Sequence, residues 1–221
     1  MTYNQKMKLN DEVIDGLCSF FKGANTLIEN DSEFATLYAY LLLQATGIER
    51  LQKIVFILDY YTNNGKQVTD DILRKKLGHG ILNIHQSHLV NHYASEDKMY
   101  YEAALQLLSE LVNVKKGHRY TNFNLHSDER FNIHDHIVQL LELEGLDYSD
   151  INDYTTASWK IMDTILKKYV AILVNLIWHK HVGNGEVMPI CLQDYVIQGW
   201  QEQSLESRIN ELLNQARRDN L

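Results

Sequence analysis

A single proline, Pro189, interrupts the 221 residues of the chain, and this scarcity strongly constrains its fold. Because proline cannot continue a helix, long proline-free stretches favour helices. Apolar residues recur along these stretches at helical spacing, as Val13, Leu17 and Phe20 do. No stretch as long as a β-strand alternates between polar and apolar residues. The sequence therefore predicts an all-α fold, an up-and-down helical bundle with additional C-terminal helices.

Polar residues and glycines mark the expected ends of these helices. The first helix is predicted to begin near Asn10 and the last, a polar and solvated one, near Ser204. We expect one domain over residues 1–221, with a core of about 30–182 and a C-terminal extension of 183–221. The expected helices between these ends cover about 33–62, 70–76, 80–93, 100–111, 129–143 and 151–181.

Charge and cysteine content restrict the class of protein. The formal net charge of −8 means that any nucleic-acid site must be a local basic patch on an acidic protein. Cys18 and Cys191 are too few for a disulfide framework and lack zinc-site spacing. Residues 1–8 are polar, and the apolar run over 169–178 is too short to span a bilayer. We expect a cytoplasmic protein that does not enter a membrane.

One loop combines basic and aromatic side chains at high density. It carries Lys115, Lys116, Arg119, Tyr120 and Phe123. The cations could hold phosphate while the two rings stack on bases, which predicts RNA binding. The alternative is a loop whose aromatics anchor it to the bundle and whose charges are simply solvated.

Histidines form a second group of candidates. His79 lies between Gly78 and Gly80 at an expected helix start, where it could transfer protons or cap the helix. His85, His88 and His92 are expected on one helix face, a pattern that can bind a divalent metal. No nearby carboxylate completes such a site, so we expect no metal and no other cofactor. The chain has no phosphate-binding glycine loop, no His-Glu-x-x-His sequence and no nucleophile elbow.

Three short stretches together resemble the HEPN superfamily of prokaryotic helical bundles, over about residues 30–180. They are Gly47–Lys53, in which Glu49 and Lys53 are expected to pair, Lys75–His79 and Arg119–Phe123. Many members are metal-independent ribonucleases of toxin–antitoxin, phage-defence or RNA-processing systems, and others only bind nucleotides or partners. The resemblance implies a homodimer that acts on RNA, with an antitoxin as a protein partner.

Active members of the superfamily carry an arginine, then four to six intervening residues, then a histidine. Pairs of about this spacing here are Arg74 with His79, Arg119 with His126, and Arg130 with His136. The pair Arg130–His136 fits best by position, at the start of a late helix, whereas Arg119 better matches the Arg-Tyr step of the family. Active members often have Asn, Asp or His directly after the arginine, and this chain has Lys, Phe or Tyr there.

The resemblance implies that Arg119, Arg130, His79 and His136 supply the catalytic groups. The histidine would move a proton to or from the RNA, and the arginine would stabilise charge on the phosphate. Replacing His136 with Ala should then abolish cleavage, and EDTA should not inhibit it. Two alternatives stay open. One is a non-catalytic interaction module whose acidic surface docks a basic partner, and the other is a His-rich metal-binding protein.

Overall fold

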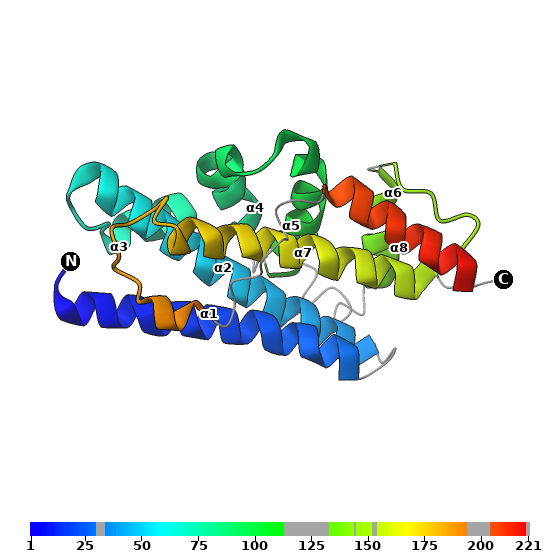
Figure 1. Ribbon diagram of the computed structural model, residues 1–221, viewed down its shortest axis with the longest axis horizontal. Helices are drawn as coiled ribbons and strands as arrows, with labels where there is room; N and C mark the ends of the chain where they lie inside the picture. Colours follow the sequence, from blue (N-terminus) through cyan, green and yellow to red (C-terminus); the bar gives the residue numbers. More distant parts are fainter. Residues whose placement is uncertain (30–33, 113–132, 144, 152–153, 194–203, 220–221) are drawn as a thin grey trace, which may run out of the picture.

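The computed structural model describes residues 1–29, 34–112, 133–143, 145–151, 154–193 and 204–219 (Figure 1). Throughout these ranges every regular element is a helix, and no strand occurs. The helices pack together as a bundle. The all-α class predicted from the sequence is therefore confirmed.

The two N-terminal helices, α1 (Tyr3–Glu29) and α2 (Phe34–Asn64), form a hairpin along the longest axis of the molecule (Figure 1). The expected start of the first helix near Asn10 is wrong. A capping box sets the start instead: the Thr2 N–H donates to Gln5 Oε1 at 2.7 Å, and the Gln5 N–H donates to Thr2 Oγ1 at 3.4 Å. Asn10 lies inside the helix and is buried.

Helix α7 (Tyr154–Trp178) lies along α2 and runs toward the same end of the molecule (Figure 1). Side-chain contacts along the whole length of the two helices fix this direction. From one end to the other, they join Tyr40 to Trp159, Gln52 to Tyr169, and Thr62 to Gly183 just beyond α7.

Shorter helices connect α2 to α7. The predicted start of a helix at about residue 70 is confirmed, because Thr69 Oγ1 accepts the N–H of Ile72 at 3.3 Å. The single helix expected over 80–93 is wrong, since three short helical pieces of different winding cover this stretch. The elements of this region are α3 (Asp70–Ile72), a π-helical turn (Leu73–Leu77), α4 (Ile81–Ile84), a second π-helical turn (His85–Leu89), two 3₁₀ turns (Val90–His92 and Ser95–Asp97), α5 (Lys98–Val112) and α6 (Ile133–Leu143).

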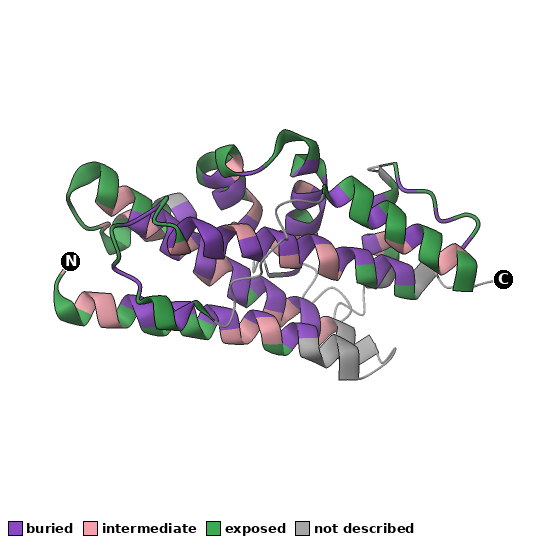
Figure 2. Ribbon diagram, viewed as in Figure 1, coloured by how far each residue is buried: buried purple, intermediate pink, exposed green. Residues whose placement is uncertain are grey.

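One hydrophobic core joins side chains from all of the long helices, and the buried faces of α2 and α7 lie at its centre (Figure 2). The last helix, α8 (Leu205–Asp219), was expected to be solvated, but only one of its faces is. Its other face buries Leu205, Ile209 and Leu213, and the helix packs along α7. A 3₁₀ turn (Pro189–Cys191) packs against α1.

Candidate functional site

His79 lies at the surface, in the turn between the first π-helical turn and α4. Gly78 adopts a φ of 52°, in the left-handed region that favours glycine, and this conformation ends the π-helical turn. His79 Nδ1 lies 3.0 Å from Glu49 Oε1 on α2. The side chain of His79 is 73% exposed and that of Glu49 only 17%. The result is a histidine–carboxylate pair in which the second ring nitrogen remains available to a ligand.

One basic side chain contacts this pair, and two others precede His79 closely in the sequence. Lys53 Nζ lies 2.5 Å from the same Glu49 Oε1, one helical turn along α2, which confirms the expected Glu49–Lys53 pair. Arg74 and Lys75, on the turn that leads to His79, form ion pairs with Asp71 at 3.5 and 2.9 Å. Both side chains are well exposed, so they can exchange this carboxylate for another anion.

A carboxylate on Nδ1 has a defined chemical effect on an imidazole. It accepts the Nδ1–H and so favours the tautomer in which Nε2 carries a lone pair. That nitrogen can then take a proton from a bound hydroxyl and later return it. The His79–Glu49 pair thus has the geometry of a general base with its orienting group.

His136, on α6, belongs to a second histidine–carboxylate pair. Its Nε2 lies 2.6 Å from Glu110 Oε2 on α5, and the side chain of His136 is 25% exposed. Gln106 Nε2 donates to the other oxygen of Glu110 at 3.0 Å. His136 is therefore less accessible than His79, and one of its ring nitrogens is already occupied.

The basic-aromatic loop and two of the three arginine candidates lie outside the described residues. Their assignment to a site therefore remains a prediction. The residues concerned are Lys115, Lys116, Arg119, Tyr120, Phe123 and Arg130. Of the three pairs with the family spacing, only Arg74 and His79 are both described.

The expected face of three histidines is wrong. His85 is fully buried, whereas His92 is exposed and His88 packs against the ring of Phe56 with 4.7 Å between ring centroids. The reason is the π-helical turn, which winds more residues into each turn than an α-helix and so separates positions three apart. Among the described side chains, no group of three His, Cys, Asp or Glu could hold a metal ion.

His85 instead joins a buried polar cluster that the sequence did not reveal. The hydroxyl of Tyr169 accepts a hydrogen bond from Gln52 Nε2 at 2.7 Å and lies 3.2 Å from His85 Nδ1. The ring of Tyr93 stacks on that of Tyr169 at 4.7 Å. Burial, and to a smaller extent the charge of Lys98, lowers the pKa of His85 to about 4. His85 is therefore neutral at pH 7 and is part of the packed core.

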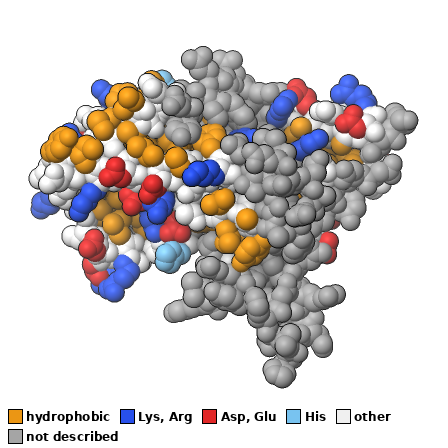
Figure 3. All heavy atoms as spheres, turned by 90° about the horizontal axis from the view of Figure 1, so that it is seen from below, with side chains coloured by type: hydrophobic (Ala, Val, Ile, Leu, Met, Phe, Trp, Pro, Cys, Tyr) orange, Lys and Arg blue, Asp and Glu red, His pale blue; other side chains and the backbone are white. Residues whose placement is uncertain are grey.

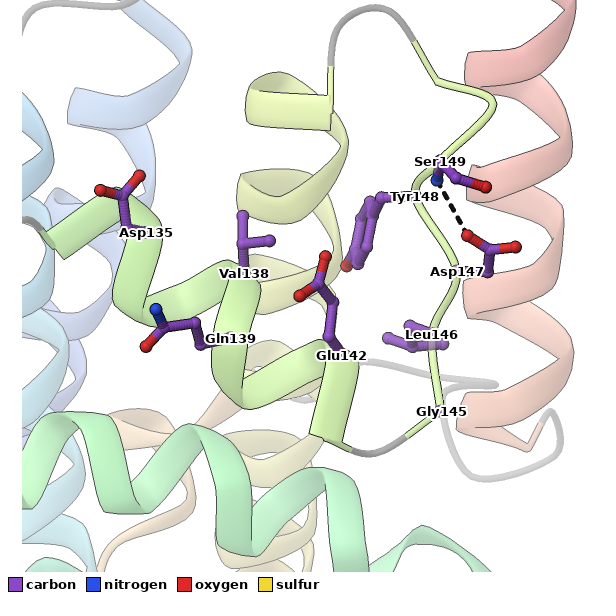
Figure 4. A pocket seen from close by; sticks show the side chains of 9 residues that line it. All are labelled: Asp135, Val138, Gln139, Glu142, Gly145, Leu146, Asp147, Tyr148 and Ser149. Carbon is purple, nitrogen blue, oxygen red and sulfur yellow. Dashed lines mark hydrogen bonds between the residues drawn. The ribbon is translucent and has the colours of Figure 1, made fainter.

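A pocket of about 700 Å³ lies between α6 and the turn that leads toward α7 (Figure 4). Carboxylates and apolar side chains share its lining, which predicts affinity for an organic cation. The residues that give it this character are Asp135, Glu142, Asp147, Val138, Leu146 and Tyr148.

Charges of both signs are interspersed on the face that Figure 3 shows. Between α1 and α2, Arg50 pairs with Glu12 at 2.7 Å and with Asp15 at 3.2 Å. The visible part of this face therefore has no broad basic surface for a polyanion.

Comparison of the chain with family models, with curated proteins and with solved structures finds no match. The resemblance to the HEPN superfamily therefore rests on the sequence motifs alone. Among the helices that the structure describes, none combines the length and apolar character needed to cross a bilayer.

Proposed function

We propose that this protein is a HEPN-like, metal-independent endoribonuclease with His79 as its proton-transfer group. The supporting observation is the 3.0 Å contact between His79 Nδ1 and Glu49 Oε1 on an exposed histidine. RNA carries its own nucleophile, the 2′-hydroxyl, so a base and a phosphate-binding cation suffice for cleavage.

In the proposed reaction, His79 Nε2 takes the proton of the 2′-hydroxyl, and the 2′-oxygen attacks the adjacent phosphorus. The bond from phosphorus to the 5′-oxygen then breaks. The imidazolium of His79 returns its proton to this leaving oxygen. The products are a 2′,3′-cyclic phosphate and a free 5′-hydroxyl, and no metal ion takes part.

The neighbours of His79 have distinct roles in this proposal. Glu49 is a positioning residue that orients the imidazole and stabilises its protonated form. Arg74, the family-spaced arginine, would contact the scissile phosphate, with Lys75 beside it. Because the whole protein carries a charge of −8, these exposed cations supply the local attraction that RNA requires.

His136 competes with His79 for the catalytic role, since it too contacts a glutamate. We favour His79 because its side chain is 73% exposed, whereas that of His136 is only 25% exposed. The homodimer, the toxin–antitoxin or phage-defence setting and an antitoxin partner belong to the proposal through the resemblance to the superfamily.

The test is cleavage of fluorogenic single-stranded and hairpin RNAs by the wild-type protein and by His79→Ala, His136→Ala and His92→Ala. We expect His79→Ala to lose at least about a hundredfold in rate. His92 is also exposed but belongs to neither histidine–carboxylate pair, so His92→Ala is the matched control and should cleave normally. Cleavage that survives His79→Ala but not His136→Ala would transfer the role to His136. No cleavage by the wild-type protein would overturn the proposal.

A non-catalytic interaction module is the second candidate, and one observation favours it. The pocket beside α6 is acidic and open to solvent, as a docking site for a basic partner would be. The His-rich metal protein has no corresponding support among the described residues.

A further inference from the structure

The side of α2 that contacts His79 continues along the helix as a row of aromatic rings. Phe56 and Tyr60 follow Glu49 by seven and eleven residues, spacings that return side chains to one side of an α-helix. The ring centroids of Phe56 and Tyr60 lie 6.1 Å apart, which agrees with this placement. Beyond the carboxylate of Glu49, this side of α2 therefore carries aromatic side chains.

The segment over 79–88 runs beside the same side of α2. At one end, His79 Nδ1 lies 3.0 Å from Glu49 Oε1. At the other end, the ring of His88 packs on that of Phe56 with 4.7 Å between centroids. The two contacts come in the same order along both segments, and α4 and the second π-helical turn both pack on α2. The rings therefore continue the side of the molecule on which His79 meets Glu49.

Phe56 supports two rings that solvent can reach. Phe56 itself is only 7% exposed, whereas His88 is exposed and Tyr60 is half-buried. The ring of Phe56 packs against both, which lowers the entropy cost of ordering them against a ligand. Accessible aromatic rings, including imidazole, are surfaces on which unpaired nucleic-acid bases stack.

The distance from the histidine–carboxylate pair to these rings matches a short stretch of RNA. At about 1.5 Å per residue, Phe56 lies about 10 Å and Tyr60 about 16 Å from Glu49 along α2. A stacked strand advances about 3.4 Å per nucleotide, so these distances correspond to about three to five nucleotides. An RNA strand with a phosphate at His79 thus reaches the rings within this length.

We infer that the substrate is single-stranded RNA and that Tyr60 and His88 stack on its bases, about three to five nucleotides from the phosphate at His79. The inference rests on the proposed ribonuclease for the position of cleavage, but stacking itself needs no catalysis. Because every base has an aromatic face, the rings select unpaired segments and not a particular base sequence. In a duplex the bases are already stacked on one another and do not reach the rings.

The experiment measures binding of a fluorescent single-stranded 2′-O-methyl RNA by anisotropy at about 50 mM salt. This oligonucleotide lacks the 2′-hydroxyl nucleophile and is not cleaved. Tyr60→Ala and His88→Ala remove the rings, and Tyr60→Phe keeps one. Tyr38→Ala is the matched control for Tyr60, because Tyr38 is also half-buried but lies near the other end of α2. His92→Ala is the control for His88, since both histidines are exposed.

We expect Tyr60→Ala and His88→Ala each to bind the oligonucleotide about tenfold more weakly, as the loss of one stacked base implies. Tyr60→Phe, Tyr38→Ala and His92→Ala should stay within about twofold of wild type, because each leaves both rings in place. A double-stranded form of the same oligonucleotide should bind more weakly than the single strand.

Photo-crosslinking to the wild-type protein provides a second measurement in case a variant folds poorly. A single strand that carries 5-iodouracil should crosslink to Tyr60 or His88, as located by mass spectrometry. Weaker binding by Tyr60→Ala, in a protein that cleaves no RNA, would support the stacking site and overturn the ribonuclease. Cleavage that depends on His79, with normal binding by both alanine variants, would do the reverse. Crosslinks confined to other residues, an equal loss in Tyr38→Ala, or no binding of the single strand would overturn the inference.

Discussion

Lys168 and Asp97 form an ion pair inside the bundle, with 2.6 Å between Nζ and Oδ2 and side-chain exposures of 8% and 3%. The pair links α7 to the 3₁₀ turn that precedes α5. The other oxygen of Asp97 accepts the N–H of Leu205 at 2.9 Å, so the same carboxylate also holds the first turn of α8. One side chain thus connects three elements that are far apart in the sequence.

Replacing Asp97 with Ala should lower the free energy of unfolding by about 3–5 kcal/mol, because the buried charge of Lys168 would lose its carboxylate counter-charge. Urea denaturation measures this loss. Arg208→Ala, which removes an exposed ion pair with Glu211, is the control and should cost less than about 1 kcal/mol. Similar costs for the two variants would contradict the assigned role of the buried pair.

His85 should make stability depend on pH. Its pKa is about 4 in the folded protein against 6.5 for the free side chain, so between these values the unfolded chain binds a proton that the folded one does not. Stability should therefore fall as the pH falls through this window. From about pH 7 to about pH 5 this group should account for a loss of about 2 kcal/mol.

The measurement compares urea unfolding of the wild-type protein and of His85→Gln at both pH values. Other groups titrate in this range as well, so the informative quantity is the difference in pH dependence between the two proteins. An equally steep fall in His85→Gln would show that the imidazole is not the group responsible.

Gly47 should not tolerate a side chain, because α1 and α2 touch there. A Cβ at this position would lie 2.7 Å from the carbonyl oxygen of Gly16 and 2.9 Å from the backbone nitrogen of Phe20. Gly47→Ala must push the helices apart and should cost about 1–3 kcal/mol or more in thermal unfolding. This contact also gives a packing reason for the glycine that opens the HEPN-like stretch.

Gly65→Ala is the comparison for Gly47→Ala. Gly65 has a φ of 63°, and no atom lies within 4 Å of an added Cβ, so only the backbone conformation opposes the substitution. We expect a cost of about 1 kcal/mol. A smaller effect at Gly47 than at Gly65 would mean that the two helices can separate easily.

Glu49→Gln should reduce RNA cleavage by about tenfold to a hundredfold, because an amide at this position cannot stabilise protonated His79. EDTA should leave the rate of the wild-type protein unchanged. Glu102→Gln, which breaks another i,i+4 pair with a lysine, is the matched control and should cleave normally. Inhibition by EDTA, or full activity of Glu49→Gln, would contradict the proposed chemistry.

Local signals in the sequence predicted local structure well, and their failures have identifiable causes. The short helical stretch begins directly after Thr69, at the predicted residue 70. Asn10 was predicted to cap a helix, but it is buried and its side chain bonds to a segment far along the chain. Its Nδ2 donates to the carbonyl oxygen of Glu186 at 3.1 Å, and its Oδ1 accepts the N–H of Met188 at 2.7 Å. No residue near Asn10 in the sequence indicates a hydrogen-bond partner so far along the chain.

The candidate site shows the same limit. The sequence singled out His79 and the stretch that contains Glu49, but their contact spans thirty residues and depends on how the turn after α3 folds back onto α2. Lys168 and Asp97 look in the sequence like ordinary surface residues, since a helix exposes most of its charges. Only the packing of α5, α7 and α8 around them reveals that they are buried.

The bond between the Leu205 N–H and Asp97 has a use in experiments on dynamics. This amide lies in the first turn of α8, where an N–H normally lacks a partner within its own helix and exchanges quickly with solvent deuterium. Here the carboxylate of another element protects it. Its exchange rate would therefore report how often the last helix leaves the bundle, independently of the fraying of the helix itself.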